Sequence, residues 1–152
     1  MNSSLYKRQI IMFIVMVIIG MLFNPMNILA YRFSDLYISQ TLFYGGLLMA
    51  SNMILAHEIV HYLSMGHFNM LVFSVGVVLS LGISIILLRQ QLLVDDKQWL
   101  RRMISHHSTA LTTTTKLLEN NNNFENNPKL YRLAKDIVYN QNREILLMKS
   151  ML

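Results

Sequence analysis

Residues 10–23, IIMFIVMVIIGMLF, form an uninterrupted apolar run that follows Lys7 and Arg8. As a helix, this run crosses much of the roughly 30 Å hydrocarbon layer of a bilayer, and the apolar character continues beyond Pro25. A basic start before an apolar run is also typical of a secretory signal, but the small-residue cleavage pattern is poor. The sequence therefore predicts a retained membrane helix over about residues 10–30, kinked near the proline.

Two further apolar segments follow, at residues 36–64 and 68–89. Both are long enough to cross a bilayer as helices. Small residues that allow close helix packing occur in each of them, namely Gly45, Gly46, Gly76 and Gly82. Three spans place the two ends of the chain on opposite sides of a membrane.

The composition fits a division into a membrane part and a water-exposed part. Of 152 residues, 53% are hydrophobic and 14% are charged. The chain has no cysteine, which excludes disulfides and thiolate metal sites. The net charge is +5, but the basic residues form no dense stripe with aromatic residues between them. We therefore expect a lipid bilayer, and no nucleic acid, as a partner.

The carboxyl-terminal residues predict a helix hairpin. The first helix opens at Asp95 and Asp96, where acidic residues are favourable, and continues through the threonines at 112–115 despite their low helix propensity. An asparagine-rich turn at 120–127 precedes Pro128, which suits the start of the second helix.

The predicted fold is therefore all-α, with a transmembrane region at 1–92 and a two-helix hairpin at 93–152. The hairpin is small for a core of its own. We expect it to pair with a second copy, as a homodimer or higher homo-oligomer, into a four-helix bundle.

The hairpin also carries candidate metal ligands. Met103, His106 and His107 lie on its first helix, and antiparallel pairing brings Gln141, Glu144 and Met148 of the second helix near them. Thioether and imidazole together favour copper, with zinc as the alternative. Gln141 and Glu144 are expected to orient the imidazoles. The structural alternative is a surface histidine pair beside core methionines.

The paired motifs M-x-x-H-H-x-x-A and L-A-x-x-I-x-x-x-Q-x-x-E-I-x-x-M, carried by residues 103–110 and 133–148, resemble those of domain-of-unknown-function family 305. The resemblance covers about residues 94–152. It implies a ferritin-like helical bundle, copper binding in the bacterial periplasm for some members, and a membrane-anchored subset. Two departures are Thr113, where members often carry methionine, and the single hairpin. Met151 is the candidate substitute for the missing ligand.

A second candidate site is a ladder at steps of four residues along the second apolar segment, formed by Met49, Met53, His57, His61 and Met65. This spacing places all five on one ridge of a helix. Histidines within a membrane segment are interpreted first as functional, here as copper ligands in a relay or sensing site. The structural alternative places the two histidines at the headgroup boundary.

The same histidines match H-E-x-x-H, the zinc-protease pattern, in His57-Glu58-Ile59-Val60-His61. A protease needs a third ligand, and Asp35 is the only other acidic residue before position 95. We therefore predict no enzyme. The leading prediction is an integral membrane protein of copper homeostasis, and the alternatives are a structural or assembly protein and an intramembrane zinc metalloprotease.

Two arguments give opposite answers about the side of the membrane on which the hairpin lies. Basic residues near the span ends favour a cytoplasmic hairpin. The resemblance to periplasmic copper binders favours the extracytoplasmic side, which we expect because charges within a folded helix count less.

Overall fold

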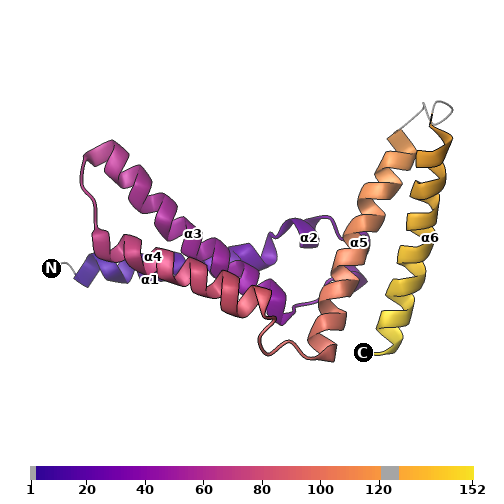
Figure 1. Ribbon diagram of the computed structural model, residues 1–152, viewed down its shortest axis with the longest axis horizontal. Helices are drawn as coiled ribbons and strands as arrows, with labels where there is room; N and C mark the ends of the chain where they lie inside the picture. Colours follow the sequence, from indigo (N-terminus) through magenta and orange to yellow (C-terminus); the bar gives the residue numbers. More distant parts are fainter. Residues whose placement is uncertain (1–2, 121–126) are drawn as a thin grey trace. The chain divides into compact units, whose positions relative to one another are not determined.

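The computed structural model describes residues 3–120 and 127–152, and this part of the chain is helical, with no strand (Figure 1). The elements are α1 (Ser3–Leu22), α2 (Pro25–Ile28), the 3₁₀ turn η1 (Phe33–Asp35), α3 (Gln40–Met65), α4 (Met70–Gly82), the π-helix η2 (Ile83–Arg89), α5 (Asp96–Asn120) and α6 (Pro128–Ser150). The predicted all-α fold, with three apolar helices ahead of two carboxyl-terminal helices, is confirmed. Most of the predicted asparagine-rich turn lies outside the described residues.

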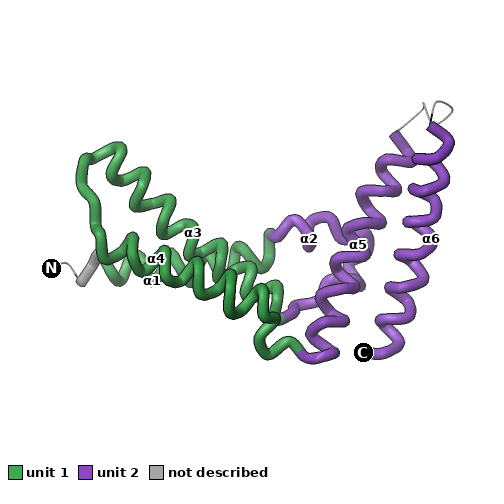
Figure 2. Tube along the Cα trace, in the orientation of Figure 1, with its two compact units in different colours: residues 1–23, 40–94 green, residues 24–39, 95–152 purple. Residues whose placement is uncertain are grey.

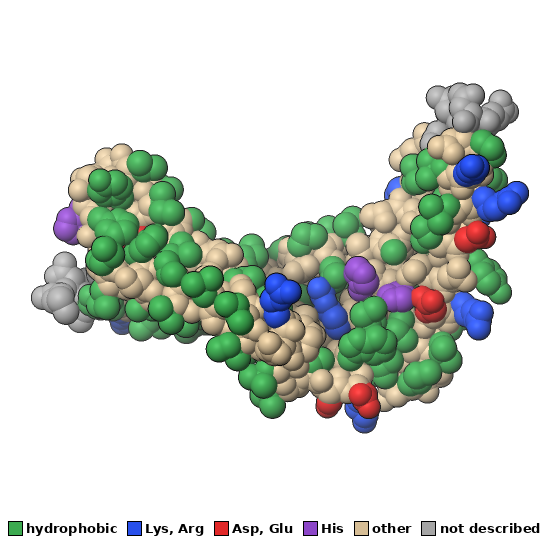
Figure 3. Space-filling model, viewed as in Figure 1, with side chains coloured by type: hydrophobic (Ala, Val, Ile, Leu, Met, Phe, Trp, Pro, Cys, Tyr) green, Lys and Arg blue, Asp and Glu red, His purple; other side chains and the backbone are tan. Residues whose placement is uncertain are grey.

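Three stretches of helix are long and apolar enough to cross a membrane: Tyr6–Ile28, Gln40–Met65 and Met70–Arg89. Many large hydrophobic side chains along them are exposed, and hydrophobic side chains spread over the surface of these helices in Figure 3. This arrangement is compatible with an integral membrane protein, because lipid tails would cover such surfaces.

The first apolar stretch is interrupted at Asn24 and Pro25. The backbone of Asn24 is extended (φ −63°, ψ 139°), which is the conformation preferred by a residue that precedes proline. Its side chain accepts a hydrogen bond from Met26 N at 3.0 Å. Pro25 then opens the separate short helix α2. The chain therefore forms two helices here, where the sequence predicted one kinked helix.

The chain divides into two compact units (Figure 2). Unit 1 contains residues 1–23 and 40–94, and unit 2 contains residues 24–39 and 95–152. The segment between the first two membrane-length helices is therefore part of the same unit as the hairpin.

In unit 1, α3 packs against both α1 and α4. Gly46 permits close approach to α1, since a Cβ there would lie 2.9 Å from the carbonyl oxygen of Val17. Tyr44 donates a hydrogen bond to the carbonyl oxygen of Leu92 at 2.7 Å, and Ser80 donates one to Asn52. Glycine contact and interhelical hydrogen bonding are the means by which membrane helices associate.

In unit 2, α5 and α6 lie side by side and bury an apolar core of Leu100, Ile104, Leu111, Ile145 and Met148. The side chain of Asn127 caps α6 by accepting from Leu130 N at 3.1 Å. The predicted helix through the threonine run is confirmed: Thr112 and Thr113 donate to carbonyl oxygens four residues earlier, at 3.4 and 3.2 Å.

Candidate functional site

A close contact joins the predicted ligand His107 on α5 to Glu144 on α6, a residue expected to orient the imidazoles. Nδ1 of His107 lies 2.9 Å from Oε2 of Glu144. The His107 side chain is 15% exposed and that of Glu144 is 48% exposed, so the pair lies at the edge of the helix interface. The predicted proximity of Glu144 to the histidine pair is therefore present in the fold.

Nδ1 of His107 is buried and makes no hydrogen bond of acceptable geometry to any residue that the structure describes, although the carboxylate is close. A carboxylate oxygen and an imidazole nitrogen with a lone pair repel each other unless a positive charge lies between them. A proton on Nδ1 is one solution and a bound cation is another. A separation of 2.9 Å also suits two ligands about 90° apart at about 2.0–2.1 Å from one metal ion.

His106 faces outward from the same turn of α5. Its ring centroid lies 6.0 Å from that of His107, with the ring planes at 76°. Partial burial, followed by the charges of His107 and Arg102, lowers the pKa of His106. The side chain therefore stays neutral to lower pH than a free histidine, and neutral imidazole is the form that binds metals.

The two methionines of the motif lie on the inner side of the hairpin. Met148 belongs to the buried core, and Met103 is half-buried against that core. The thioethers therefore contribute to packing, as the structural alternative proposed. The half-buried Gln141 lies three residues before Glu144 on α6, and the proposed substitute Met151 is exposed at the end of that helix.

The ladder residues on α3 have separate surroundings. The Sδ of Met49 lies beside Gly20, where an added Cβ would approach it to 3.1 Å. Met49, Met53 and Met65 are all exposed. The rings of His57 and His61 stack at 6.2 Å between centroids and 19° between planes. Nδ1 of His61 lies 2.9 Å from the carbonyl oxygen of His67.

Glu58 of the H-E-x-x-H pattern is buried and stabilises the turn between α3 and α4. Its Oε2 accepts a hydrogen bond from Asn69 N at 3.2 Å, and Asn69 in turn caps α4 by accepting from Val72 N at 3.3 Å. Nδ1 of His57 lies 3.8 Å from Oε1 of Glu58. Over residues 3–120 and 127–152, no three histidine, cysteine or acidic side chains form a group that could hold a metal ion.

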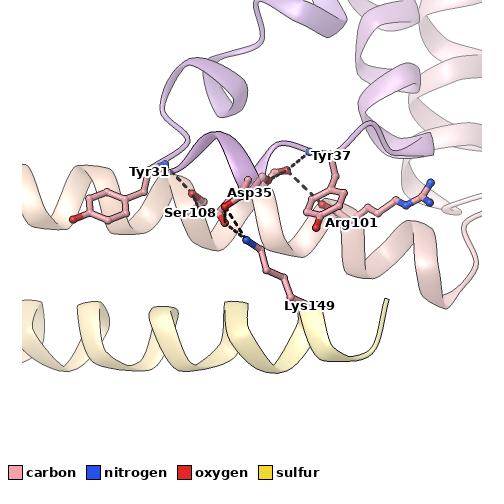
Figure 4. Close-up of polar contacts among 8 residues, drawn as sticks. Tyr31, Asp35, Tyr37, Arg101, Ser108 and Lys149 are labelled. Atoms are coloured by element: carbon pink, nitrogen blue, oxygen red, sulfur yellow. Dashed lines mark hydrogen bonds and ion pairs between the residues drawn. The ribbon is translucent and has the colours of Figure 1, made fainter.

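A polar cluster that sequence reasoning missed lies in unit 2, and we call Asp35, Ser105, Ser108 and Lys149 the Asp35 latch (Figure 4). Asp35 is fully buried. Its Oδ1 lies 2.6 Å from Nζ of Lys149, and its Oδ2 accepts from Ser108 at 2.7 Å. Ser105 donates to the carbonyl oxygen of Asp35 at 2.9 Å. The latch thus ties residues 24–39 to both helices of the hairpin.

Backbone groups of the same segment complete the latch. Tyr31 N donates to Ser108 Oγ at 2.8 Å, and Tyr37 N donates to Ser105 Oγ at 3.4 Å. Tyr37 also packs against the apolar core of the hairpin. One signal pointed to this cluster: Asp35 is a solitary acid within a long stretch without other acidic residues, and such an acid requires a partner.

The fold and the site define a helical protein with three membrane-length helices and a hairpin that brings histidine and carboxylate together. Residues 88–152 match the family model described as Domain of unknown function (DUF305), so this part of the chain is a DUF305 domain. No curated protein matches the chain. No solved structure matches it either.

Proposed function

We propose that this protein is an integral membrane protein whose DUF305 hairpin binds copper in copper handling or tolerance, without catalysing a reaction. His107, His106 and Glu144 would supply nitrogen and oxygen ligands at the hairpin surface. Met103 and Met148 would lie behind them as soft donors and packing residues. Imidazole with carboxylate suits Cu(II), and thioether favours Cu(I), whereas zinc is the competing metal.

The observation that supports this proposal is the contact between His107 Nδ1 and Glu144 Oε2, 2.9 Å apart without a properly directed hydrogen bond. With its proton on Nε2, the ring of His107 presents Nδ1 as a second acceptor beside the carboxylate, and that arrangement attracts a cation. His106 adds an exposed imidazole whose pKa is lowered by burial, His107 and Arg102, so it competes for the metal while neutral.

The test is elemental analysis of the full chain, purified without a histidine tag and dialysed against copper or zinc. His107→Ala and the double variant with His106→Ala should lose most of the bound copper. His67→Ala, an exposed histidine on the turn after α3, is the matched control and should retain it. Equal copper content in all four proteins contradicts the proposal.

The α3 ladder is a separate prediction, and the same measurement tests it. His57→Ala together with His61→Ala should lower the copper content if the ladder binds the metal. An unchanged content restricts copper to the hairpin and gives the two histidines a structural role beside Glu58 and His67.

Self-association through the hairpin is the second candidate function, for a structural or assembly protein. Its support is a set of exposed large hydrophobic side chains along α6: Leu133, Tyr139, Leu146 and Leu147. A second copy would remove them from water, as in a four-helix bundle. Light scattering in detergent should give a dimer for the natural chain and a monomer for Leu146→Glu, while a monomeric natural chain contradicts this candidate.

A further inference from the structure

The segment between the first two membrane-length helices is short and continuous with both of them. The first such stretch ends with α2 at Ile28, and the second begins at Gln40, so the linker of residues 24–39 includes α2. If those helices cross a bilayer, as proposed above, this linker starts and ends at the membrane surface. Residues 24–39 nevertheless fold together with the hairpin in unit 2.

The polarity of this linker is inverted relative to a segment that faces water. Its buried members are polar, with Asp35 0% and Ser39 3% exposed. Its large apolar side chains are instead exposed, with Phe33 93% and Ile38 69% exposed, beside the exposed Arg32 and Ser34. Ile28 and Tyr31 are also exposed. In water this arrangement is unfavourable, whereas an apolar neighbour on the outer side makes it favourable.

The hairpin prevents the linker from turning its apolar side chains inward. The Asp35 latch holds its centre through contacts of 2.6, 2.7 and 2.9 Å to Lys149, Ser108 and Ser105. At the end of the first membrane-length helix, Thr109 donates to the carbonyl oxygen of Met26 at 3.3 Å, and Arg102 donates to the sulfur of Met26. The exposed apolar side of the linker, which we call its outer face, is therefore turned away from the hairpin, because the opposite side of the linker is bonded to α5 and α6.

The charge on the outer face also fits a lipid surface. Arg32 is exposed, and its guanidinium carbon lies 5.7 Å from the centroid of the Tyr31 ring. Tyrosine and arginine at the ends of membrane helices are typical of the headgroup region, where the ring enters the boundary and the cation meets phosphate.

We infer that the outer face of the linker, formed by Ile28, Tyr31, Phe33 and Ile38, inserts into the headgroup and acyl boundary of the bilayer, held there by the Asp35 latch. This inference rests on the proposed membrane insertion of the three long helices. The DUF305 hairpin is then held at the membrane surface through its own fold, in addition to its covalent connection to η2.

The absence of cysteine allows a direct test by single spin labels in the full chain. Phe33→Cys and Ile38→Cys, both at exposed positions, are labelled and reconstituted in vesicles of phosphatidylcholine and phosphatidylglycerol. The labels should be accessible to oxygen and shielded from a water-soluble nickel chelate. Asn140→Cys, an exposed polar position on α6, is the water-facing control.

Ile14→Cys, at an exposed position on α1, separates the two possible failures. If the label at position 14 is open to the nickel chelate, membrane insertion itself is wrong. If position 14 is shielded while position 33 resembles position 140, insertion holds and the linker inference is overturned.

Lys149→Met in the Phe33→Cys background tests the latch. It should increase access of nickel to the label, because the unpaired carboxylate of Asp35 is no longer stable inside unit 2. Lys116→Met, which removes an exposed pair with Glu119 on α5, is the control and should leave the label shielded. Equal shielding in both variants overturns the role of the latch in holding the linker.

Discussion

At the residue scale, the Asp35–Lys149 pair is the strongest polar feature of unit 2. A carboxylate with no exposed surface is stable only with a counter-charge and hydrogen-bond donors, and Lys149 with Ser108 provides them. Both partners lie far from each other in sequence, so the pair reports the tertiary fold directly.

Removing one partner of this pair should destabilise the protein unequally. Lys149→Met leaves a buried, unpaired carboxylate and should lower the free energy of unfolding by about 3–5 kcal/mol. Asp35→Asn should cost less, because the ammonium of Lys149 is partly exposed and can reach water. Chemical denaturation in detergent, followed by circular dichroism, measures both changes. Combining Lys149→Met with Asp35→Asn should recover part of the loss, and simple additivity would argue against direct coupling.

At the element scale, the approach of α1 to α3 depends on which of two adjacent glycines faces the neighbouring helix. A Cβ on Gly46 would lie 2.9 Å from Val17 O and 3.0 Å from Met21 Cγ, whereas a Cβ on Gly45 meets no atom of the described residues within 4 Å. The sequence identified both as small contacts, and the structure separates them.

Gly46→Ala should therefore destabilise unit 1, by about 1–3 kcal/mol, because the helix backbones must move apart. Gly45→Ala is the matched control and should be neutral or stabilising by up to about 1 kcal/mol, since alanine is the better helix former. Thermal unfolding in one detergent, compared between the two variants, measures the difference. Equal midpoints would show that α1 and α3 do not pack through Gly46.

At the scale of the whole molecule, three membrane crossings would place the turn between α3 and α4 on the side opposite to the hairpin and the linker. That unit 2 combines residues 24–39 with 95–152 agrees with such a topology, because both segments would lie on one side. We propose that this is the extracytoplasmic side, as expected from the resemblance to periplasmic copper binders.

This topology predicts the labelling of single cysteines by a membrane-impermeant maleimide. Asn140→Cys should react in intact cells, while Ser64→Cys, at the exposed carboxyl-terminal end of α3, should react only after permeabilisation. The reverse result assigns the hairpin to the cytoplasm. Reaction of both positions in intact cells contradicts a membrane crossing by Met70–Arg89, the stretch that separates them.

The sequence by itself determined which segments are helical, because apolar length and helix end signals are local properties of a sequence. The division into α1 and α2 at Pro25 was not predicted. It also indicated that Glu144 lies near His107, since a short turn leaves little freedom in how two helices pair. Only the tertiary structure decided that residues 24–39 fold with the hairpin. The pair Asp35–Lys149 spans 114 positions, and its partners are chosen by burial and geometry that no local pattern contains. The same reason explains why Met148, a predicted ligand, lies in the apolar core: its direction depends on how α6 is rotated against α5.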